Sequence, residues 1–293
     1  MGHFAKIEEI IEDAKKGKIF ILVDDEDREN EGDLIIPAEK CGNQEVNFMA
    51  KFGRGLVCLA LEKERIRELG LPMMALNNNS RHQTAFTISI EAREGITTGI
   101  STLDRAKTIS DAIDSNKDRR DIVSPGHVFP LQAREGGVLV RAGHTEASVD
   151  IAKLANLNPS AVICEIMNDD GTMARRDDLF EFSKKHNLKI ATISELIKYR
   201  TKNDKLIEKI AENKINSSFG GKFIAADYQN KIDNSKYKVL IYGKISEDDN
   251  ILVRMHHLHF NNDILANDLG QNNNLAKSMK IIAKNGSGVV VIF

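Results

Sequence analysis

The sequence is short of cysteine, of long apolar runs and of net charge, and each shortage restricts the class of protein. Its three cysteines, Cys41, Cys58 and Cys164, stand far apart among 293 residues and lack Cys-x-x-Cys spacing. They predict reduced thiols and exclude a disulfide framework or a zinc knuckle. No stretch approaches the roughly 18 apolar residues of a membrane span, and the N-terminus has no apolar signal core. The formal net charge of -2 argues against binding to nucleic acid or anionic membranes. We therefore expect a soluble, cytoplasmic protein with neither partner.

The composition is that of an ordinary globular protein, with 41% hydrophobic and 29% charged residues, and the length suits two domains. Predicted helices and strands alternate up to about Tyr199. This pattern favours an α+β (layered α/β) fold, in which a mixed sheet is flanked by helices. The polar segment 201–205 is the expected linker. We therefore place one domain at residues 1–200 and a second, smaller α/β domain at residues 206–293.

Apolar residues at helical spacing between Phe4 and Ala14 predict a helix that ends at Gly17. Further helices are expected at residues 103–113, opened by Ser101 and Thr102, and at about 146–154. Extended segments are expected in the first domain at residues 19–23, 34–37, 55–61, 84–90, 138–140 and 161–166. In the second domain they are expected at residues 239–242, 251–255 and 289–293.

The segment from Asp24 to Asp33 holds seven carboxylates in ten positions. An acidic run of this kind is most often a solvated turn. Here it lies between two apolar strands, where mutual repulsion costs energy unless a cation or a ligand offsets it. Carboxylate oxygens suit Mg²⁺, which takes few protein ligands. Arg28, in the middle of the run, can bind a phosphate or form a bidentate ion pair with a carboxylate.

A second candidate segment, Arg141 to Glu146, follows the predicted strand 138–140. A strand end, a small-residue turn and a helix start bring backbone N–H groups and the Thr145 hydroxyl around an anion, and Arg141 adds a positive charge. His144 has two interpretations. It is a helix cap or surface histidine, or, together with the acidic run, a metal ligand.

Three further positions are candidates for the chemistry. His127 lies in the segment 124–130, whose two prolines and glycine predict a stiff loop, and it is a general acid–base candidate. Glu165, inside an apolar strand, either faces water at the sheet edge or is a partly buried acid with a raised pKa. Residues 97–102 offer hydroxyls to a phosphate, or Ser101 or Thr102 simply caps the next helix. Cys58 either lines the site or is a buried structural thiol.

Together these segments resemble the 3,4-dihydroxy-2-butanone 4-phosphate synthase family of riboflavin biosynthesis over roughly residues 5–200. The resemblance is carried by residues 25–33, 97–101 with Asp104-Arg105, 126–131 and 141–146. It implies a homodimeric α+β lyase that converts D-ribulose 5-phosphate into formate and 3,4-dihydroxy-2-butanone 4-phosphate. That reaction needs enediol formation, dehydration and a skeletal shift, which a metal ion and acid–base groups assist. Thr102 stands where the family more often has a small residue.

The resemblance also implies roles for individual residues. Glu29 and His144 are expected to bind Mg²⁺ (or Mn²⁺), and His127 and Glu165 to be essential for proton transfer. The expected substrate contacts are Arg28, Glu29, Asp33, Arg141, Ala142, Gly143, His144, Thr145 and Glu165.

The second domain resembles a degenerate, truncated GTP cyclohydrolase II domain. Residues 252–259 and 281–289 carry this resemblance. No cysteine follows Cys164, and residues 267–270 read Asn-Asp-Leu-Gly where that family has Cys-Asp-Cys-Gly. Structural zinc is bound by four ligands in a tetrahedral arrangement. The sequence offers His256, His257 and His259, but no second group of ligand residues to complete the four. We therefore expect that cyclohydrolase activity is lost. A bifunctional enzyme, or an interaction or regulatory role for this domain, are the alternatives.

Overall fold

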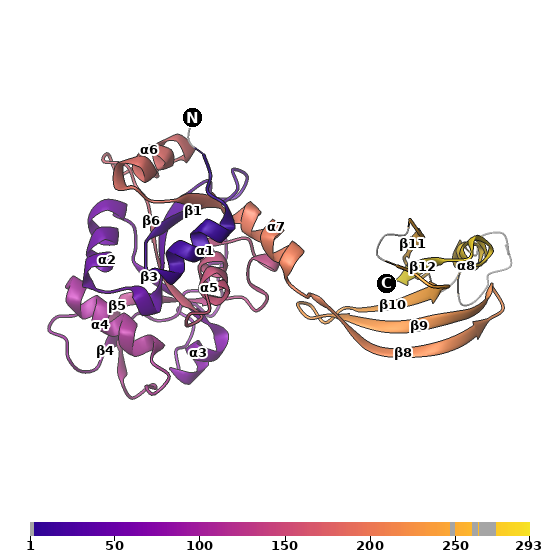
Figure 1. Cartoon of the computed structure of the whole chain (residues 1–293). Coiled ribbons are helices and arrows are strands. Elements are labelled where there is room, and N and C mark those ends of the chain that lie inside the picture. The colour runs from indigo at the N-terminus through magenta and orange to yellow at the C-terminus, as the bar shows by residue number, and fades with distance from the viewer. Residues whose placement is uncertain (1–2, 247–249, 260–262, 264–273) are drawn as a thin grey trace. The chain divides into compact units, whose positions relative to one another are not determined.

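The computed structural model describes residues 3–246, 250–259, 263 and 274–293. The chain divides into two compact units, Met1–Asn203 and Asp204–Phe293, each with its own sheet (Figure 1). No helix of the described residues is long and apolar enough to cross a membrane.

The first unit is built on a seven-stranded sheet in the order β4-β5-β3-β6-β2-β1-β7. Its strands are β1 (Phe20–Val23), β2 (Gly32–Pro37), β3 (Cys58–Glu62), β4 (Ile90–Ala92), β5 (Ile122–Ala133), β6 (Ser160–Glu165) and β7 (Ile190–Thr192). β1 with β7 and β3 with β5 are parallel pairs, and the other neighbours are antiparallel. The expected mixed sheet is therefore confirmed.

Helices cover both faces of this sheet. On one face lie α1 (Ile7–Lys15), α5 (His144–Leu154) and α7 (Ile193–Asn203), and on the other α2 (Asn43–Phe48), α3 (Lys63–Glu68), α4 (Thr102–Ile113) and α6 (Arg176–His186). Strand alternation divides the apolar side chains between two cores: in β1, Ile21 and Val23 join one core, and Phe20 and Leu22 join the other. Because the side chains on both faces of β1 are buried, every position of this strand is apolar.

The predicted strand at residues 138–140 is wrong. The segment forms a 3-10 turn, Gly137–Leu139, where two consecutive glycines, Gly136 and Gly137, have φ of 92° and 64°. The backbone N–H of Val138 donates to Asp150 Oδ2 at 2.8 Å, so a carboxylate of α5 takes the hydrogen bond that a neighbouring strand would otherwise accept.

Two other local predictions need correction. The segment 124–130, expected to be a stiff loop, is part of β5, so His127 lies on a strand. Residues 84–90 form no continuous strand. Phe86 and Thr87 make single bridges, to Leu131 and Met73, and the regular strand β4 begins only at Ile90.

The second unit is a five-stranded sheet in the order β11-β12-β10-β9-β8. It comprises β8 (Ile207–Ser217), β9 (Gly221–Asn230), β10 (Lys236–Tyr242), β11 (Leu252–His256) and β12 (Gly288–Ile292), with α8 (Asn274–Asn285). Met279 and Ile282 of α8 pack on Phe223, Leu240 and Val290 of the sheet. A second, smaller α/β unit with the three expected strands is thus confirmed. The expected linker 201–205 is partly helical, because α7 continues to Asn203.

Candidate active site

The acidic loop between β1 and β2 is organised around the buried side chain of Asp24. Asp24 Oδ2 accepts hydrogen bonds from Arg28 Nη1 at 2.6 Å and from the backbone N–H of Glu29 at 3.2 Å. Asp24 Oδ1 accepts one from the backbone N–H of Glu31 at 2.9 Å. Glu29 and Glu31 are consequently half-buried, whereas residues 25–27 face solvent. The loop therefore combines a solvated tip with carboxylates turned inward.

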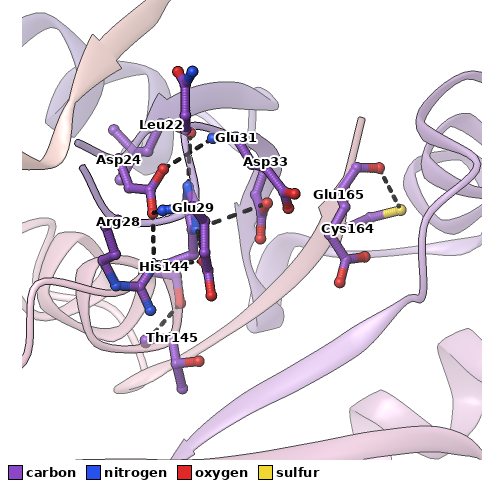
Figure 2. A network of polar contacts seen from close by, with 12 residues as sticks. Leu22, Asp24, Arg28, Glu29, Glu31, Asp33, His144, Thr145, Cys164 and Glu165 are labelled. Carbon is purple, nitrogen blue, oxygen red and sulfur yellow. Dashed lines mark hydrogen bonds and ion pairs between the residues drawn. The ribbon is translucent and has the colours of Figure 1, made fainter. Parts of the chain in front are cut away.

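His144 begins α5 and is buried against this loop (Figure 2). Its Nε2 donates a hydrogen bond to the backbone carbonyl oxygen of Leu22 at 3.2 Å. Its Nδ1 lies 3.8 Å from Glu29 Oε2 and 3.8 Å from Asp33 Oδ1. Asp24, Glu29 and His144 each offer a ligand atom, and these atoms lie within 4.8 Å of one another. Carboxylate oxygens with one imidazole fit a divalent cation such as Mg²⁺ or Mn²⁺.

The charges of this cluster compensate one another. Burial disfavours the Glu29 carboxylate, but the nearby His144 and the charge of Arg28 outweigh it and lower the pKa of Glu29 to about 2. Burial likewise opposes the charged form of His144, yet the charges of Asp33 and Glu29 raise the pKa of His144 to about 9. Burial raises the pKa of Asp33, and the charge of His144 offsets part of this rise. The carboxylates of the site thus stabilise a positive charge placed between them, and a bound cation would supply such a charge.

A cavity of about 120 Å³ lies beside this cluster. It is lined by Arg28, Glu29, Glu31, Asp33, Cys58, Thr84, Phe86, Leu131, Arg141, His144, Thr145, Ile163 and Glu165. The cavity therefore brings together residues from the acidic loop, from the start of α5 and from the end of β6.

The start of α5 forms the cationic part of the cavity wall. A Cβ atom on Gly143 would lie 2.4 Å from Arg141 Nη1, so the glycine lets the guanidinium fold back over the helix start. There Arg141 Nη1 donates to Glu146 Oε2 at 2.6 Å. Helix N–H groups, the Thr145 hydroxyl and the guanidinium together favour an anion. Ala142, between Arg141 and Gly143, is exposed.

Glu165 ends β6, and the pairing of β6 with β2 places it opposite Asp33. Its Oε2 accepts a hydrogen bond from the backbone N–H of Leu56 at 2.8 Å. A Cβ atom on Gly55 would lie 2.5 Å from this oxygen, so glycine is required for the close approach. Because the Leu56 amide is used here, β3 begins at Cys58 and not at residue 55. Burial raises the pKa of the Cys58 thiol, which makes Cys58 an unreactive part of the wall.

His127 has an exposed side chain and is not among the residues that line the cavity. Its Nδ1 contacts Glu91 Oε1, and the Glu91 side chain is 13% exposed. Cβ atoms on Gly99 and Gly126 would clash with Glu91, so both glycines make room for it. Glu91 was missed by sequence reasoning, because no spacing links it to a histidine 36 residues later.

Three hydroxyls of the segment 97–102 make local structural contacts. Ser101 caps α4, its Oγ accepting the backbone N–H of Asp104 at 3.0 Å. Thr97 Oγ1 donates to Asp104 Oδ2 at 2.8 Å, and Thr102 Oγ1 contacts Asn43 Oδ1. The helix-capping interpretation therefore accounts for Ser101.

The segment between α3 and β4 supplies site residues that sequence reasoning missed. Thr84 and Phe86 line the cavity, and His82 Nδ1 lies 3.8 Å from Glu29 Oε1. Arg141 Nη2 donates to the backbone carbonyl oxygen of His82 at 3.0 Å. Only the fold brings this segment to the acidic loop, so no motif signals it.

The histidines of the second unit do not form a shared ligand group among the described residues. His256 is buried, and its Nε2 pairs with Asp263 Oδ2 at 2.9 Å. The ring centroids of His257 and His259 lie 5.2 Å apart, with the ring planes tilted by 49°. In the part of the chain that the structure describes, the Asp24 cluster is the one potential metal group. The segment 267–270 lies outside the described residues.

Comparison with known proteins gives two family matches. Residues 8–199 match the family 3,4-dihydroxy-2-butanone 4-phosphate synthase, and residues 208–293 match GTP cyclohydrolase II. A 3,4-dihydroxy-2-butanone 4-phosphate synthase of Photobacterium phosphoreum is 51% identical over 97% of this chain and 78% of its own length.

Solved structures agree with these matches. RibBX, a two-domain 3,4-dihydroxy-2-butanone 4-phosphate synthase from A. baumannii, has a TM-score of 0.78 at 40% identity, covering 99% of this chain and 81% of its own. A synthase of the same name, in complex with two magnesium ions, has a TM-score of 0.66 at 38% identity, covering 69% of this chain and 99% of its own.

The layered fold carries a carboxylate–imidazole group that could hold a divalent cation, and the family that its sequence matches is a family of lyases. The chain belongs to the 3,4-dihydroxy-2-butanone 4-phosphate synthase family. The predicted family and enzyme class, and the cyclohydrolase II-like second domain, are thereby confirmed.

Proposed function

We propose that this chain converts D-ribulose 5-phosphate into formate and L-3,4-dihydroxy-2-butanone 4-phosphate, as a cytoplasmic step of riboflavin biosynthesis. The observation that carries the proposal is one shared cavity. Glu29 and His144, Arg141 and Thr145, and Glu165 all line it. A cation site, an anion site and a proton-transfer group are what cleavage of a sugar phosphate needs in one place.

Glu29 and His144 are the proposed metal ligands, with Asp24 close behind them. A divalent cation held there would polarise substrate oxygens and stabilise the negative charge that develops on them. The magnesium-bound relative supports Mg²⁺, and the imidazole donor suits Mn²⁺ as well.

The protein groups have separate tasks in this proposal. Arg141, Thr145 and the start of α5 bind the phosphate, while Arg28 and Asp33 hold the sugar hydroxyls. Glu165 removes a carbon-bound proton to give the enediol and returns protons later. One molecule of water is lost in the dehydration step, and one is added when formate is released. The atoms of the two products therefore equal those of the substrate.

We infer that His127 reaches the reaction from a second copy of the chain in a homodimer. Within one chain His127 is absent from the cavity lining, and its side chain is 45% exposed. Two exposed apolar side chains follow Gly99, which lies so close to Glu91, the partner of His127, that an added Cβ would clash with it: Ile100 is 54% and Leu103 66% exposed. Exposed apolar side chains near a histidine that does not line the cavity within its own chain favour a contact between copies.

Mixing inactive variants tests this dimer directly. His127→Ala and Glu165→Gln homodimers are each expected to be inactive. After subunit exchange, half of the dimers carry one of each chain, and one site in each mixed dimer is intact. About a quarter of wild-type activity is therefore expected to return. No recovery after proven exchange would contradict the shared site.

For the second unit we propose loss of the cyclohydrolase reaction, with the functional division at residues 1–200 and 206–293. No cysteine follows Cys164, so a thiolate set for zinc is missing from the sequence. The exposed side chains of Val253, Met255 and Ile281 favour an interaction role as the second candidate. Metal analysis and a GTP turnover assay test this: stoichiometric zinc with GTP hydrolysis would support a bifunctional enzyme.

A further inference from the structure

Arg175 is hydrogen-bonded to the backbone of the acidic loop, although it lies 146 residues further along the chain than Glu29. Its Nη1 donates to the carbonyl oxygen of Glu29 at 2.7 Å and to that of Asn30 at 2.5 Å. Asn30 has φ of 55°, in the left-handed region that asparagine tolerates better than most residues, and the chain turns there. One guanidinium nitrogen therefore holds two consecutive peptide groups of the loop.

The backbone of Glu29 is thereby held from two directions. Its N–H donates to Asp24 Oδ2 at 3.2 Å, and its carbonyl oxygen accepts from Arg175. With the peptide groups on both sides of Glu29 held, the direction of its Cα–Cβ bond is held as well, and Oε2 lies 3.8 Å from His144 Nδ1. Asp24 belongs to the loop itself, so Arg175 supplies a contact from outside the loop.

Arg175 comes directly before α6, in a part of the chain that is itself well held. The backbone N–H of Ala174 donates to the carbonyl oxygen of Ile166 at 3.0 Å, just beyond the end of β6. A Cβ atom on Gly32 would lie 2.6 Å from Leu179 Cδ1, so α6 packs closely on the first residue of β2, where the acidic loop ends. Arg175 thus connects the acidic loop to a fixed part of the unit.

We propose that Arg175 is a positioning residue, which holds the backbone of Glu29 so that the Glu29 carboxylate can bind the divalent cation together with His144. This inference rests on the proposed function of the Glu29–His144 site. The side chain of Arg175 is 47% exposed and is not among those that line the cavity of about 120 Å³. Arg175 therefore acts through Glu29 and not on the substrate.

The charge of Arg175 and its hydrogen bonds have opposite effects on a bound cation. Arg175 Nη1 lies 3.7 Å from Glu31 Oε1, so the guanidinium weakens the negative potential that attracts a cation. Removal of the charge alone would therefore strengthen Mg²⁺ binding. Loss of the hydrogen bonds would release the backbone of Glu29 and weaken Mg²⁺ binding, because partners that orient a metal ligand typically contribute about 10–100-fold in affinity. The direction of the change separates the two effects.

The test is calorimetric titration of the full-length protein with Mg²⁺, without substrate. Arg175→Met removes the charge and the donors at similar length, and Arg175→Lys keeps the charge without the guanidinium geometry. Arg176→Met is the matched control. It removes the same charge from the next residue, whose Nη1 lies 3.4 Å from Glu26 Oε1 at the solvated tip of the loop. We expect Mg²⁺ affinity to fall at least about 10-fold in Arg175→Met, to fall less in Arg175→Lys, and not to fall in Arg176→Met.

Circular dichroism and thermal unfolding without metal show whether each variant is folded. Mg²⁺ affinity equal to or above that of the wild type in folded Arg175→Met would overturn the inference and leave the Glu29–His144 site intact. An equal loss in Arg176→Met would also overturn it, because the effect would then not depend on the bonds to Glu29 and Asn30. If Arg175→Met does not fold, unchanged affinity in Arg175→Lys would overturn it. Mg²⁺ binding that survives Glu29→Gln would instead overturn the proposed metal site itself.

Discussion

His144 donates a hydrogen bond from Nε2 to the backbone carbonyl oxygen of Leu22, 3.2 Å away. A carbonyl oxygen only accepts, so Nε2 carries the proton and Nδ1 is the atom turned toward Glu29 and Asp33. The backbone of β1 therefore fixes which nitrogen can bind a cation. A protein partner behind the ring is the usual way in which a metal-binding histidine is oriented.

Removing either proposed ligand should abolish metal-dependent turnover. We expect Glu29→Gln and His144→Ala to weaken Mg²⁺ binding by at least about 10–100-fold, because so few protein groups hold the ion. Calorimetric titration with Mg²⁺ measures this, and circular dichroism checks that the variants are folded. Wild-type Mg²⁺ affinity in both folded variants would contradict the ligand assignment.

Glu91 is expected to act on the reaction only through His127. Its side chain contacts His127 Nδ1, so it holds the ring in one orientation and tautomer. General acid–base groups contribute about 10²–10⁴ in rate, and we expect His127→Ala to lose a factor in this range. Glu91→Gln should lose less, with kcat reduced, KM almost unchanged and the pH profile of kcat shifted.

The double variant Glu91→Gln/His127→Ala separates positioning from a general structural effect. If Glu91 works through His127, the double variant should be no slower than His127→Ala alone. Fully multiplied losses would show that the two residues act independently.

Gly55→Ala should damage the site by displacing Glu165. The added Cβ would lie 2.5 Å from Glu165 Oε2 and 2.5 Å from its backbone oxygen. Overpacking of this kind costs about 1–3 kcal/mol, and we expect kcat to fall together with the melting temperature.

Gly171→Ala is the control for this substitution. Gly171 has φ of 87°, so alanine there is strained, but its Cβ would meet no atom within 4 Å. It should lower the melting temperature without lowering kcat. Unchanged kcat in Gly55→Ala would show that Glu165 tolerates displacement or does no chemistry.

The first unit should fold and react without the second. A chain ending at Asn203 keeps Arg200, whose Nη1 donates to Asp150 Oδ2 at 2.7 Å and to the Gly136 carbonyl oxygen at 2.9 Å. A chain ending at Tyr199 loses both bonds. Hydrogen bonds of charged groups contribute about 1.5–3 kcal/mol, so the shorter chain should be less stable by about that amount.

Denaturant titration of the two truncated chains measures the difference. The magnesium-bound relative, which aligns over 99% of its own length with 69% of this chain, shows that a synthase can be a single unit. A 1–203 chain that is folded but inactive would mean that the second unit supports the reaction.

The fold was predictable where burial decides the residue type. β1 and β6 are apolar because both of their faces are covered, and those strands were predicted within a residue or two. Residues 138–140 are equally apolar, but the carboxylate of Asp150 and two glycines with positive φ make them a turn. A run of three apolar residues does not reveal that contact.

The site was predictable where its residues are neighbours in sequence. The acidic run and the turn from Arg141 to Thr145 each form a compact group, and the cavity contains both. His82 and Glu91 were not predictable, because each meets its partner only through the tertiary fold. A single histidine or glutamate in a loop or strand carries no signal of such a contact.

The most direct test of the central claim is formate release from D-ribulose 5-phosphate by the purified full-length protein. With added Mg²⁺, we expect formate and 3,4-dihydroxy-2-butanone 4-phosphate to appear in equal amounts, and chelation of the metal to stop both. No formate from a folded, Mg²⁺-loaded protein would contradict the proposed reaction, and undiminished turnover in chelator would contradict the role of the cation.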